Sequence, residues 1–426
     1  MSRVHSAELD LAAWEERFVL REPELRAFVE EPERFERVRA EAAAGASGAS
    51  GKPGALAGVL LGVKDIFHVA GLPTRAGSQL PVSRLAGDEG PCVRALREAG
   101  AIVAGKTVTT EFAYFSPGPT SNPAAPGHTP GGSSSGSAAA VAAELGDLAL
   151  GTQTIGSLGR PAAFCGGGGW KPSWERISRA GVIPLAPSLD HVGFLARDVA
   201  TLLRAAPLAA RHWSAAPDPS RRARLGVPCG PYLESLSPAG REHFVRLRAH
   251  LEARGHEIVD VAAMPDFPQI AERHRRLVAF EAAAVHADWY GRFGELYAAK
   301  TAELIERGRT IAEAEATRAR AGRLELREAL ETAMENKGLD LWLSPPAVGP
   351  APAGLDSTGD PVMNLPWTYA GLPTLVLRAG ASSDELGIAL PMGAQVSARF
   401  GADEGLLAWG SVLEGELLGM NRKGEP

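Results

Sequence analysis

The spacing of hydrophobic and polar residues along the chain predicts alternating helices and strands. Residues 7–44 are rich in Ala, Glu, Leu and Arg, and their apolar positions recur at helical spacing, which predicts two or more helices. The segment GVLLGVKDIF at 58–67 opens with a nearly unbroken apolar run, which is typical of a buried strand. A helix that leads into a strand is expected over 90–107 and again over 243–261.

The rest of the chain continues this alternation. Residues 275–337 are long, charged and helical in pattern. Alternation of this kind predicts an α/β fold in which helices cover both faces of one large sheet. The remaining expected elements are a helix start over 138–143 and strands over 148–154, in LDLWLSP at 339–345, in LPTLVLRAG at 372–380 and in ELGIALPMGAQV at 385–396.

Composition and charge narrow the class of protein. The 426 residues are 45% hydrophobic and 22% charged, which is ordinary for a globular chain. A net charge of −6 provides no positive surface for nucleic acid. The three cysteines (Cys92, Cys165 and Cys229) are too few and too scattered for a disulfide framework, so we expect a reduced, cytoplasmic setting. The N-terminus does not resemble a signal peptide, and no uncharged apolar run is long enough to cross a bilayer.

The stretch GTQTIGSLGRPAA at 151–163 is the first candidate for chemistry. Its glycines permit backbone geometries that other residues avoid, and they let main-chain N–H groups come close to a ligand. Pro161 is expected to prevent a helix from continuing through this stretch. The residues alone leave two interpretations open, a sharp turn or a site around Ser157.

A second Gly/Ser stretch, GGSSSGS at 131–137, directly precedes the apolar segment AAAVAA. A loop of this composition at the start of a helix presents free N–H groups, which favours a site over a polar linker. The stretch also matches G-x-S-x-G with Ser134 in the centre, but a nucleophile elbow needs a strand directly before it. Three prolines in the preceding NPAAPGHTP indicate that this match is accidental.

Lys64 is the third candidate, because it follows the apolar run of 58–67. Burial disfavours the charged form of a lysine and lowers its pKa, and a neutral lysine is a base. Its neighbour Asp65 is interpreted as a strand-end cap. His128 and His191 are the histidines that a Ser-His-Asp arrangement would use, but no acid accompanies His128 in a recognisable motif, and His191 equally suits packing. No metal-binding motif or phosphate loop is found, so neither a metal nor a cofactor is expected.

Several rare strings, in order, resemble the amidase signature family. They are GGSSSGSAAAVAA, GTQTIGSLGRPAAFCG and KPSWERISRAGVIPLAPSLDHVGFLAR, with GVKDIF before them and NLPWTYAGLP and LPMGAQV after them. The resemblance is strong from about residue 58 to 200 and thinner through the last quarter. The spacing between Ser133 and Ser157 also matches the family pattern.

This resemblance implies a large mixed β-sheet covered by helices, and amide hydrolysis through an acyl-enzyme without a cofactor. Ser157 resembles the nucleophile, Ser133 the bridging serine whose preceding peptide bond is cis, and Lys64 the base that completes the catalytic triad. Ser134 resembles a supporting residue that hydrogen-bonds within the triad, and Gln153 occupies a second supporting position. The oxyanion hole would be formed by the main-chain N–H groups of Thr154, Ile155, Gly156 and Ser157.

Three positions depart from the family pattern. Many members have an Asp where this chain has Gln153, and an Arg where it has Gly159, while Arg160 follows one position later. An arginine buried against a neutral amide is less well compensated than one buried against a carboxylate, so we expect Arg160 to face elsewhere. The GTQT string resembles a subgroup of small-amide hydrolases more than the glutaminase subunit of the tRNA amidotransferase.

The implied organisation is a single amidase domain over residues 1–426. Substrate choice is expected in the helical segment 268–330 and in DSTGDPVMNLPW at 356–367. There Asp356, Asp360, Asn364 and Trp367 either line a pocket or serve loop capping and core packing. The expected parts are N-terminal helices and a linker (1–57, with GASGASGKPG at 45–54), the signature core (58–200), a helical substrate-side region (201–340), and C-terminal strands and a helix (341–426).

The sequence therefore predicts an amidohydrolase that cleaves the carboxamide C–N bond of a small substrate and releases ammonia or an amine. One alternative is the glutaminase subunit of a tRNA-dependent amidotransferase, which needs partner chains. Another is a non-catalytic binding protein on the same fold, and the retention of Lys64, Ser133 and Ser157 speaks against it. The expected partner is a small-molecule amide, with neither nucleic acid nor membrane, and a homodimer is left open.

Overall fold

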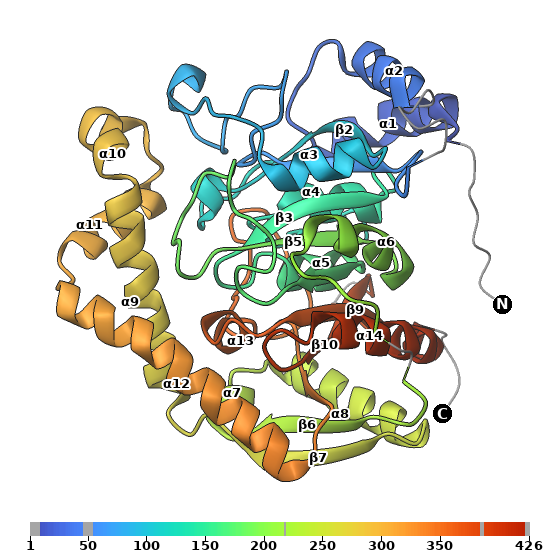
Figure 1. Cartoon of the computed structure of the whole chain (residues 1–426), viewed down its shortest axis with the longest axis vertical. Coiled ribbons are helices and arrows are strands. Elements are labelled where there is room, and N and C mark those ends of the chain that lie inside the picture. The colour runs from blue at the N-terminus through green and yellow to red at the C-terminus, as the bar shows by residue number, and fades with distance from the viewer. Residues whose placement is uncertain (1–8, 46–53, 217–218, 384–386, 422–426) are drawn as a thin grey trace.

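In the computed structural model, which describes residues 9–45, 54–216, 219–383 and 387–421, ten strands form a single mixed sheet (Figure 1). Runs of apolar residues that are buried on both faces account for the central strands. The strands are β1 (Leu60–Lys64), β2 (Ile102–Thr107), β3 (Leu148–Gln153), β4 (Gly168–Lys171), β5 (His191–Ala196), β6 (Arg224–Cys229), β7 (Glu257–Ala262), β8 (Leu341–Ser344), β9 (Thr374–Ser383) and β10 (Ala389–Ser397).

The sheet combines parallel edges with an antiparallel centre. The strand order is β2-β1-β3-β5-β4-β9-β10-β8-β6-β7. β1 is parallel to β2 and β3, and β6 is parallel to β7 and β8. The neighbours from β3 through β5, β4, β9 and β10 to β8 are antiparallel. The mixed α/β architecture that the sequence predicts is confirmed.

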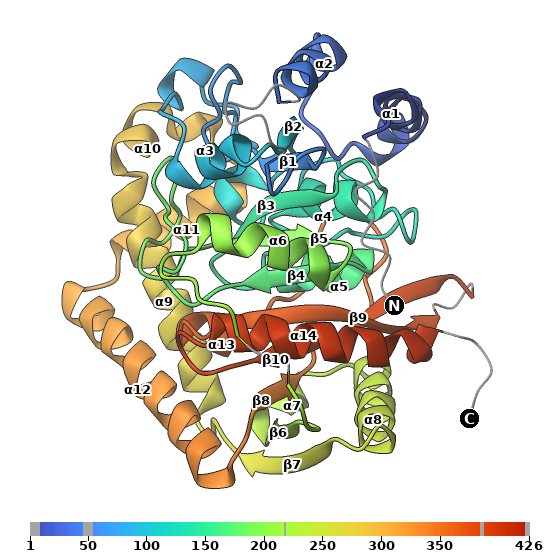
Figure 2. The ribbon, with the colours of Figure 1, turned by 45° about the vertical axis from the view of Figure 1, so that its right-hand side comes forward.

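Helices cover both faces of this sheet. On one face, α4 packs against β1, β2, β3 and β5, α5 against β4, β9 and β10, and α8 against β7 and β9. On the other face, α6 packs against β5 and α14 against β9, and α3 contacts α6 (Figure 2). These helices are α3 (Pro91–Glu98), α4 (Ser135–Ala142), α5 (Gly159–Cys165), α6 (Val199–Ala209), α8 (Pro238–Ala253) and α14 (Asp403–Leu417).

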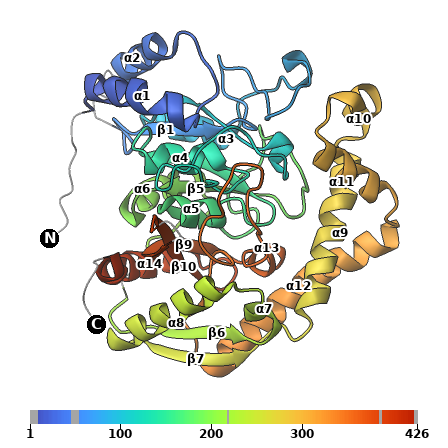
Figure 3. The ribbon, with the colours of Figure 1, turned by 180° about the vertical axis from the view of Figure 1, so that it is seen from behind.

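A further group of helices runs along one side of the molecule, where it is seen from the front in Figure 1 and from behind in Figure 3. Its central member, α9, contacts α7, α10, α11, α12 and α13. The two N-terminal helices, α1 and α2, lie at the opposite end from β7. The helices are α1 (Leu11–Leu25), α2 (Arg34–Gly45), α7 (Pro231–Glu234), α9 (Phe267–Val285), α10 (Ala287–Phe293), α11 (Ala299–Arg309), α12 (Glu313–Lys337) and α13 (Leu365–Tyr369).

One end of the sheet collects the residues that the sequence singles out. Because β1 and β3 are parallel neighbours, Lys64 and Gln153 lie at the same end. β5 runs in the opposite direction and begins there, since His191 pairs with Gln153. The loop that leads into α4 reaches this end as well, because the Gly136 N–H donates to the carbonyl of Val108, just after β2.

The structure contradicts one of the sequence predictions of secondary structure, and some predicted segments lie partly outside the residues that it describes. The prediction that Pro161 prevents a helix is wrong, because α5 begins at Gly159 and holds the proline in its first turn. A proline is tolerated there, since the first N–H groups of a helix have no intrahelical acceptor. Most of the expected connection at 45–54 lies outside the described residues, as do 385 and 386 of the last expected strand. Within the described ranges, no helix combines the length and apolar character needed to span a membrane.

Candidate active site

Lys64 ends β1, and its side chain is completely buried. Its Nζ donates to Ser133 Oγ and to Thr152 Oγ1, each at 2.7 Å. Burial lowers the pKa of Lys64 from 10.5 to about 7, and the negative charge of Asp190 opposes only part of this effect. The amine therefore gains and loses a proton close to neutral pH, with two hydroxyls as its hydrogen-bond partners.

The loop before α4 carries Ser133 to Lys64. The peptide bond between Gly132 and Ser133 is cis, the conformation that the resemblance implies. The carbonyl of Gly132 accepts a hydrogen bond from Arg160 Nη2 at 2.7 Å, and the carbonyl of Ser133 accepts one from Thr110 N–H at 3.3 Å. Contacts on both sides of the bond thus fix the position of the Ser133 hydroxyl.

Ser134, the next residue, binds the backbone of β3. Its hydroxyl donates to the carbonyl of Thr152 at 3.3 Å and lies 3.4 Å from the Thr152 N–H, which donates to it. The family resemblance implies that this serine hydrogen-bonds within the triad. It instead holds the loop against Thr152, the second hydrogen-bond partner of Lys64.

Ser157 lies in the turn between β3 and α5. It lines a small cavity together with Ser133, Thr154, Ile155 and Arg160. Among the described residues, no acceptor is found for the N–H groups from residue 154 to residue 157. These four groups are free to bind an oxygen that becomes negatively charged, as the predicted oxyanion hole requires.

The side chain of Gln153 hydrogen-bonds both ends of this turn's support, the start of α5 and Thr368 of α13. Its Oε1 accepts the N–H groups of Leu158 and Gly159 at 2.9 and 3.0 Å, so the free N–H groups end at Ser157. Its Nε2 donates to Thr368 Oγ1 at 2.9 Å, and that hydroxyl also hydrogen-bonds the carbonyl of Ile155 at 2.7 Å. Because an amide both accepts and donates, Gln153 links the turn to α13 in a way that a carboxylate could not.

Arg160 is buried at the other end of the turn. As expected, it does not pair with Gln153. Nη1 donates to the carbonyl of Gly359 at 2.9 Å, and Nη2 donates to Thr358 Oγ1 at 3.1 Å as well as to Gly132. Burial lowers the pKa of Arg160 to about 9, while the charge of Asp360 opposes this effect. Arg160 therefore joins the serine loop to the segment around residue 358.

Asn364 explains why two positions of the turn are glycine. A Cβ atom added to Gly156 would lie 2.4 Å from Asn364 Oδ1, and one added to Gly159 would lie 2.8 Å from its Nδ2. Asn364 Nδ2 also donates to Gln395 Oε1 at 2.7 Å. Asn364 is thus buried in the core behind the turn. It does not line the pocket of about 380 Å³ that opens beside the Ser157 cavity.

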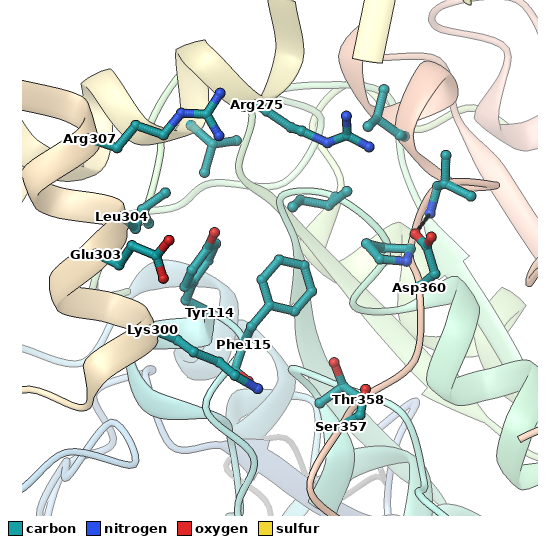
Figure 4. Close-up of a pocket in the computed structure, with 15 residues that line it drawn as sticks. Tyr114, Phe115, Arg275, Lys300, Glu303, Leu304, Arg307, Ser357, Thr358 and Asp360 are labelled. Atoms are coloured by element: carbon teal, nitrogen blue, oxygen red, sulfur yellow. Dashed lines mark hydrogen bonds between the residues drawn. The ribbon is translucent and has the colours of Figure 1, made fainter. Parts of the chain in front are cut away.

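A pocket of about 380 Å³ opens next to the cavity of Ser157, and Figure 4 shows charged side chains around it. The two hollows share Tyr114, Phe115, Ile155 and Pro361. α9 contributes Arg275 to the pocket wall. The other charged residues in the lining are Lys300, Glu303, Arg307 and Asp360.

The four residues predicted to bind substrate are not together. Asp360 lines the pocket, and its Oδ1 accepts the Val362 N–H at 2.9 Å. Asp356 is exposed and lies outside the pocket lining. Trp367 is completely buried, where its Nε1 donates to Tyr232 Oη at 3.1 Å. Trp367 and Asn364 accordingly have the packing role that the sequence left open.

The two candidate histidines lie outside the Ser157 cavity. His128 forms a β-bridge with Ala353. His191 donates from Nδ1 to the carbonyl of Leu189 at 2.7 Å, and burial keeps its pKa well below the usual value. Across the described ranges, no group of three or more His, Cys, Asp and Glu side chains is arranged to hold a metal ion.

Sequence reasoning missed several residues that hold the site together. Thr152 binds Lys64, and Asp190 accepts the Thr154 hydroxyl at 2.5 Å through its Oδ1. Burial raises the pKa of Asp190 to about 6. Thr368 and His274 each bind a carbonyl of the turn. Thr152, Asp190 and Thr368 stand inside strings that carry the family resemblance, whereas nothing local marks His274, which comes from a distant helix.

Comparison with known proteins identifies the family of this chain. A family model described as Amidase matches residues 16–407. A glutamyl-tRNA(Gln) amidotransferase subunit of Synechococcus sp. (strain RCC307) is 32% identical over 446 aligned residues, which cover 92% of this chain and 90% of that one. A solved amidase structure has a TM-score of 0.85 and 33% identity, with 96% of this chain and 95% of that chain covered. The peptide amidase in complex with chymostatin has a TM-score of 0.79 and 28% identity over 95% of this chain and 93% of its own. The chain described here belongs to the Amidase family, the family of the amidase signature.

Proposed function

We propose that this chain hydrolyses amide C–N bonds through an acyl-enzyme on Ser157. The single observation that carries the proposal is the 2.7 Å hydrogen bond between Lys64 Nζ and Ser133 Oγ, next to the cavity that Ser133 shares with Ser157. A serine hydroxyl is a weak nucleophile until a neighbouring base takes its proton. A lysine whose pKa lies at about 7 is a suitable base.

The proposed reaction has two halves. Ser157 Oγ attacks the amide carbon while its proton passes to Ser133 and the Ser133 proton passes to neutral Lys64. The oxyanion that forms is held by the N–H groups of the turn. The C–N bond then breaks, and the leaving nitrogen takes a proton back from Lys64 through Ser133. Water attacks the acyl ester along the same route, which frees the acid and restores the Ser157 hydroxyl.

A fluorophosphonate probe tests the nucleophile. The probe should add one adduct per chain, peptide mapping should place it on Ser157, and Ser157→Ala should abolish it without unfolding the protein. Ser173→Ala is the matched control, because Ser173 is also buried but donates to Asp403 outside the Ser157 cavity, and it should leave labelling intact. An adduct on Ser134 would favour the nucleophile-elbow interpretation, and absence of any adduct would favour a non-catalytic binding protein.

For the substrate, we propose a small amide with a polar or charged far end. The pocket beside Ser157 holds about 380 Å³ and carries charged side chains from α11 and α9. Arg307 is paired with Glu272 at 3.1 Å, and Lys300 donates to the carbonyl of Phe115 at 3.4 Å. Within the described residues no ion pair is found for Arg275, so its guanidinium is the group best placed to meet a negatively charged substrate.

The second candidate is the glutaminase subunit of a tRNA-dependent amidotransferase. It is supported by the name of relatives that match most of the chain, such as the 32% identical amidotransferase subunit from Synechococcus. The purified chain alone should release ammonia from simple amides if it is a free-standing amidase. Strict dependence on a second polypeptide and a charged tRNA would assign it to the amidotransferase.

A further inference from the structure

His274 lies on α9 and reaches the turn of the candidate oxyanion hole. Its side chain is completely buried, and its Nε2 lies 2.9 Å from the carbonyl of Thr154. Burial lowers the pKa of His274 to about 4, so the ring is neutral and its single proton is on Nε2, where the carbonyl needs a donor. The edge of the ring also packs against Tyr369, with 5.8 Å between the ring centres.

Each of three successive carbonyls in the turn accepts a hydrogen bond from a different donor. His274 binds the carbonyl of Thr154, Thr368 Oγ1 binds that of Ile155, and the N–H of Arg160 binds that of Gly156 at 3.1 Å. These three donors come from α9, α13 and α5, which lie far apart in the sequence.

The direction of a carbonyl fixes the direction of the next N–H group. The peptide bonds of this turn are trans, and the C=O and N–H of a planar trans peptide point in opposite directions. A donor that holds the Thr154 carbonyl therefore aims the Ile155 N–H away from His274, and Ile155 is one of the residues that line the Ser157 cavity. The other two donors do the same for the N–H groups of Gly156 and Ser157.

We infer that His274 is a positioning residue of the oxyanion hole, which acts by holding the Thr154 carbonyl so that the Ile155 N–H faces the reacting oxygen. The inference rests on the proposed acyl-enzyme function. It also connects the hole to the substrate pocket, because the next residue of the same helix, Arg275, lines that pocket. A preorganised donor acts on the transition state more than on the bound substrate.

The test compares three substitutions at one position. His274→Met removes the donor and keeps an apolar side chain of similar length, so kcat should fall by about 10²-fold while KM changes by less than about threefold. His274→Gln keeps an N–H donor at similar reach and should recover activity to within about tenfold of the parent. His274→Asn is polar but one carbon shorter, so it should resemble His274→Met.

A tetrahedral inhibitor separates positioning from folding. An alkyl boronic acid on Ser157 mimics the oxyanion intermediate, so its Ki should rise in His274→Met by the same factor by which kcat/KM falls. His286→Met is the matched control, because His286 is also buried and its pKa is also lowered to about 4. Its Nδ1 lies 3.0 Å from Tyr297 Oη, and it does not contact the turn. The control substitution should destabilise the fold similarly and leave kcat within about threefold.

Two results would overturn the inference. One is a His274→Met enzyme whose kcat and boronate Ki match those of the His286→Met control. The other, decisive if the methionine variant does not fold, is a pair of equally active Gln and Asn variants. Failure of the underlying function is a different observation, since the parent enzyme would then show neither labelling of Ser157 nor boronate inhibition.

Discussion

Two buried lysines on neighbouring strands differ in the groups that face them. Lys64 at the end of β1 donates to two hydroxyls, whereas Lys106 on β2 forms an ion pair with Asp65 at 2.7 Å. Burial lowers the pKa of both lysines, but the Asp65 carboxylate opposes the effect at Lys106 by stabilising its charge. Burial alone therefore does not make a lysine a base, because the neighbouring groups decide which lysine keeps its proton.

A third lysine supports the same conclusion. Lys171 is buried at the end of β4, and its pKa is also lowered to about 7. Its Nζ donates to the carbonyls of Pro172 and Leu372, which have no proton to give. A low pKa therefore indicates a candidate base only when a hydroxyl that can give up its proton lies beside the lysine, as Ser133 lies beside Lys64.

The largest expected effect follows from replacing Lys64, the proposed base. Lys64→Arg should lower amide turnover on the order of 10³-fold or more, because a guanidinium keeps its proton throughout the accessible pH range. Lys64→Ala should lower amide turnover further than turnover of an activated ester, whose leaving group needs no proton. Ammonia release and ester hydrolysis measure the two rates. Near-normal amide turnover in Lys64→Ala would show that another group is the base.

Breaking the ion pair should affect stability and not chemistry. Lys106→Met leaves the buried Asp65 carboxylate without its cation, which should cost about 3–5 kcal/mol of unfolding free energy. Urea denaturation measures the loss, and kcat per probe-labelled site should stay within about threefold. Lys106→Met combined with Asp65→Asn should recover part of the stability. Loss of kcat from the folded Lys106→Met enzyme would mean that this pair takes part in the reaction.

The smallest expected effect is a shift in the pH dependence of activity. The lowered pKa of Lys64 means that its neutral, active form is depleted below about pH 7, so activity should rise through that pH and level off on the alkaline side. Asp190 stabilises the charged lysine, so Asp190→Asn should move the rise to lower pH in a kcat/KM profile. Lys106→Met serves as the control and should leave the profile in place. A shift to higher pH in Asp190→Asn would contradict this account.

The sequence predicts the framework of the site better than its supports. The apolar run before Lys64 correctly indicates a buried strand, and the stretch at 151–163 starts at the same end of the sheet as Lys64 because the parallel strands β1 and β3 end together. The prediction that Pro161 prevents a helix is wrong, since a proline that disrupts a helix interior is tolerated in a first turn.

What the sequence could not predict depends on contacts between distant segments. Gln153 binds Thr368, and His274 binds Thr154, more than a hundred positions apart in each case. The sequence leaves Asn364 open between lining a pocket and packing in the core, and the structure places it behind two glycines. No local pattern distinguishes an amide that faces a ligand from one that faces the backbone.

The buried guanidinium of Arg160 has a consequence for how this enzyme could change its substrate. One side chain bonds the carbonyl next to Ser133 and also the segment at residues 358–359, and this segment adjoins the substrate pocket. Thr358 and Gly359 therefore cannot vary without moving the serine loop. Asp360 also lines this pocket, but its charge stabilises the Arg160 guanidinium, so a change there would reach the serine loop as well. The Ser357 side chain lines the pocket and does not bond Arg160, so we expect specificity to be easier to change at this position.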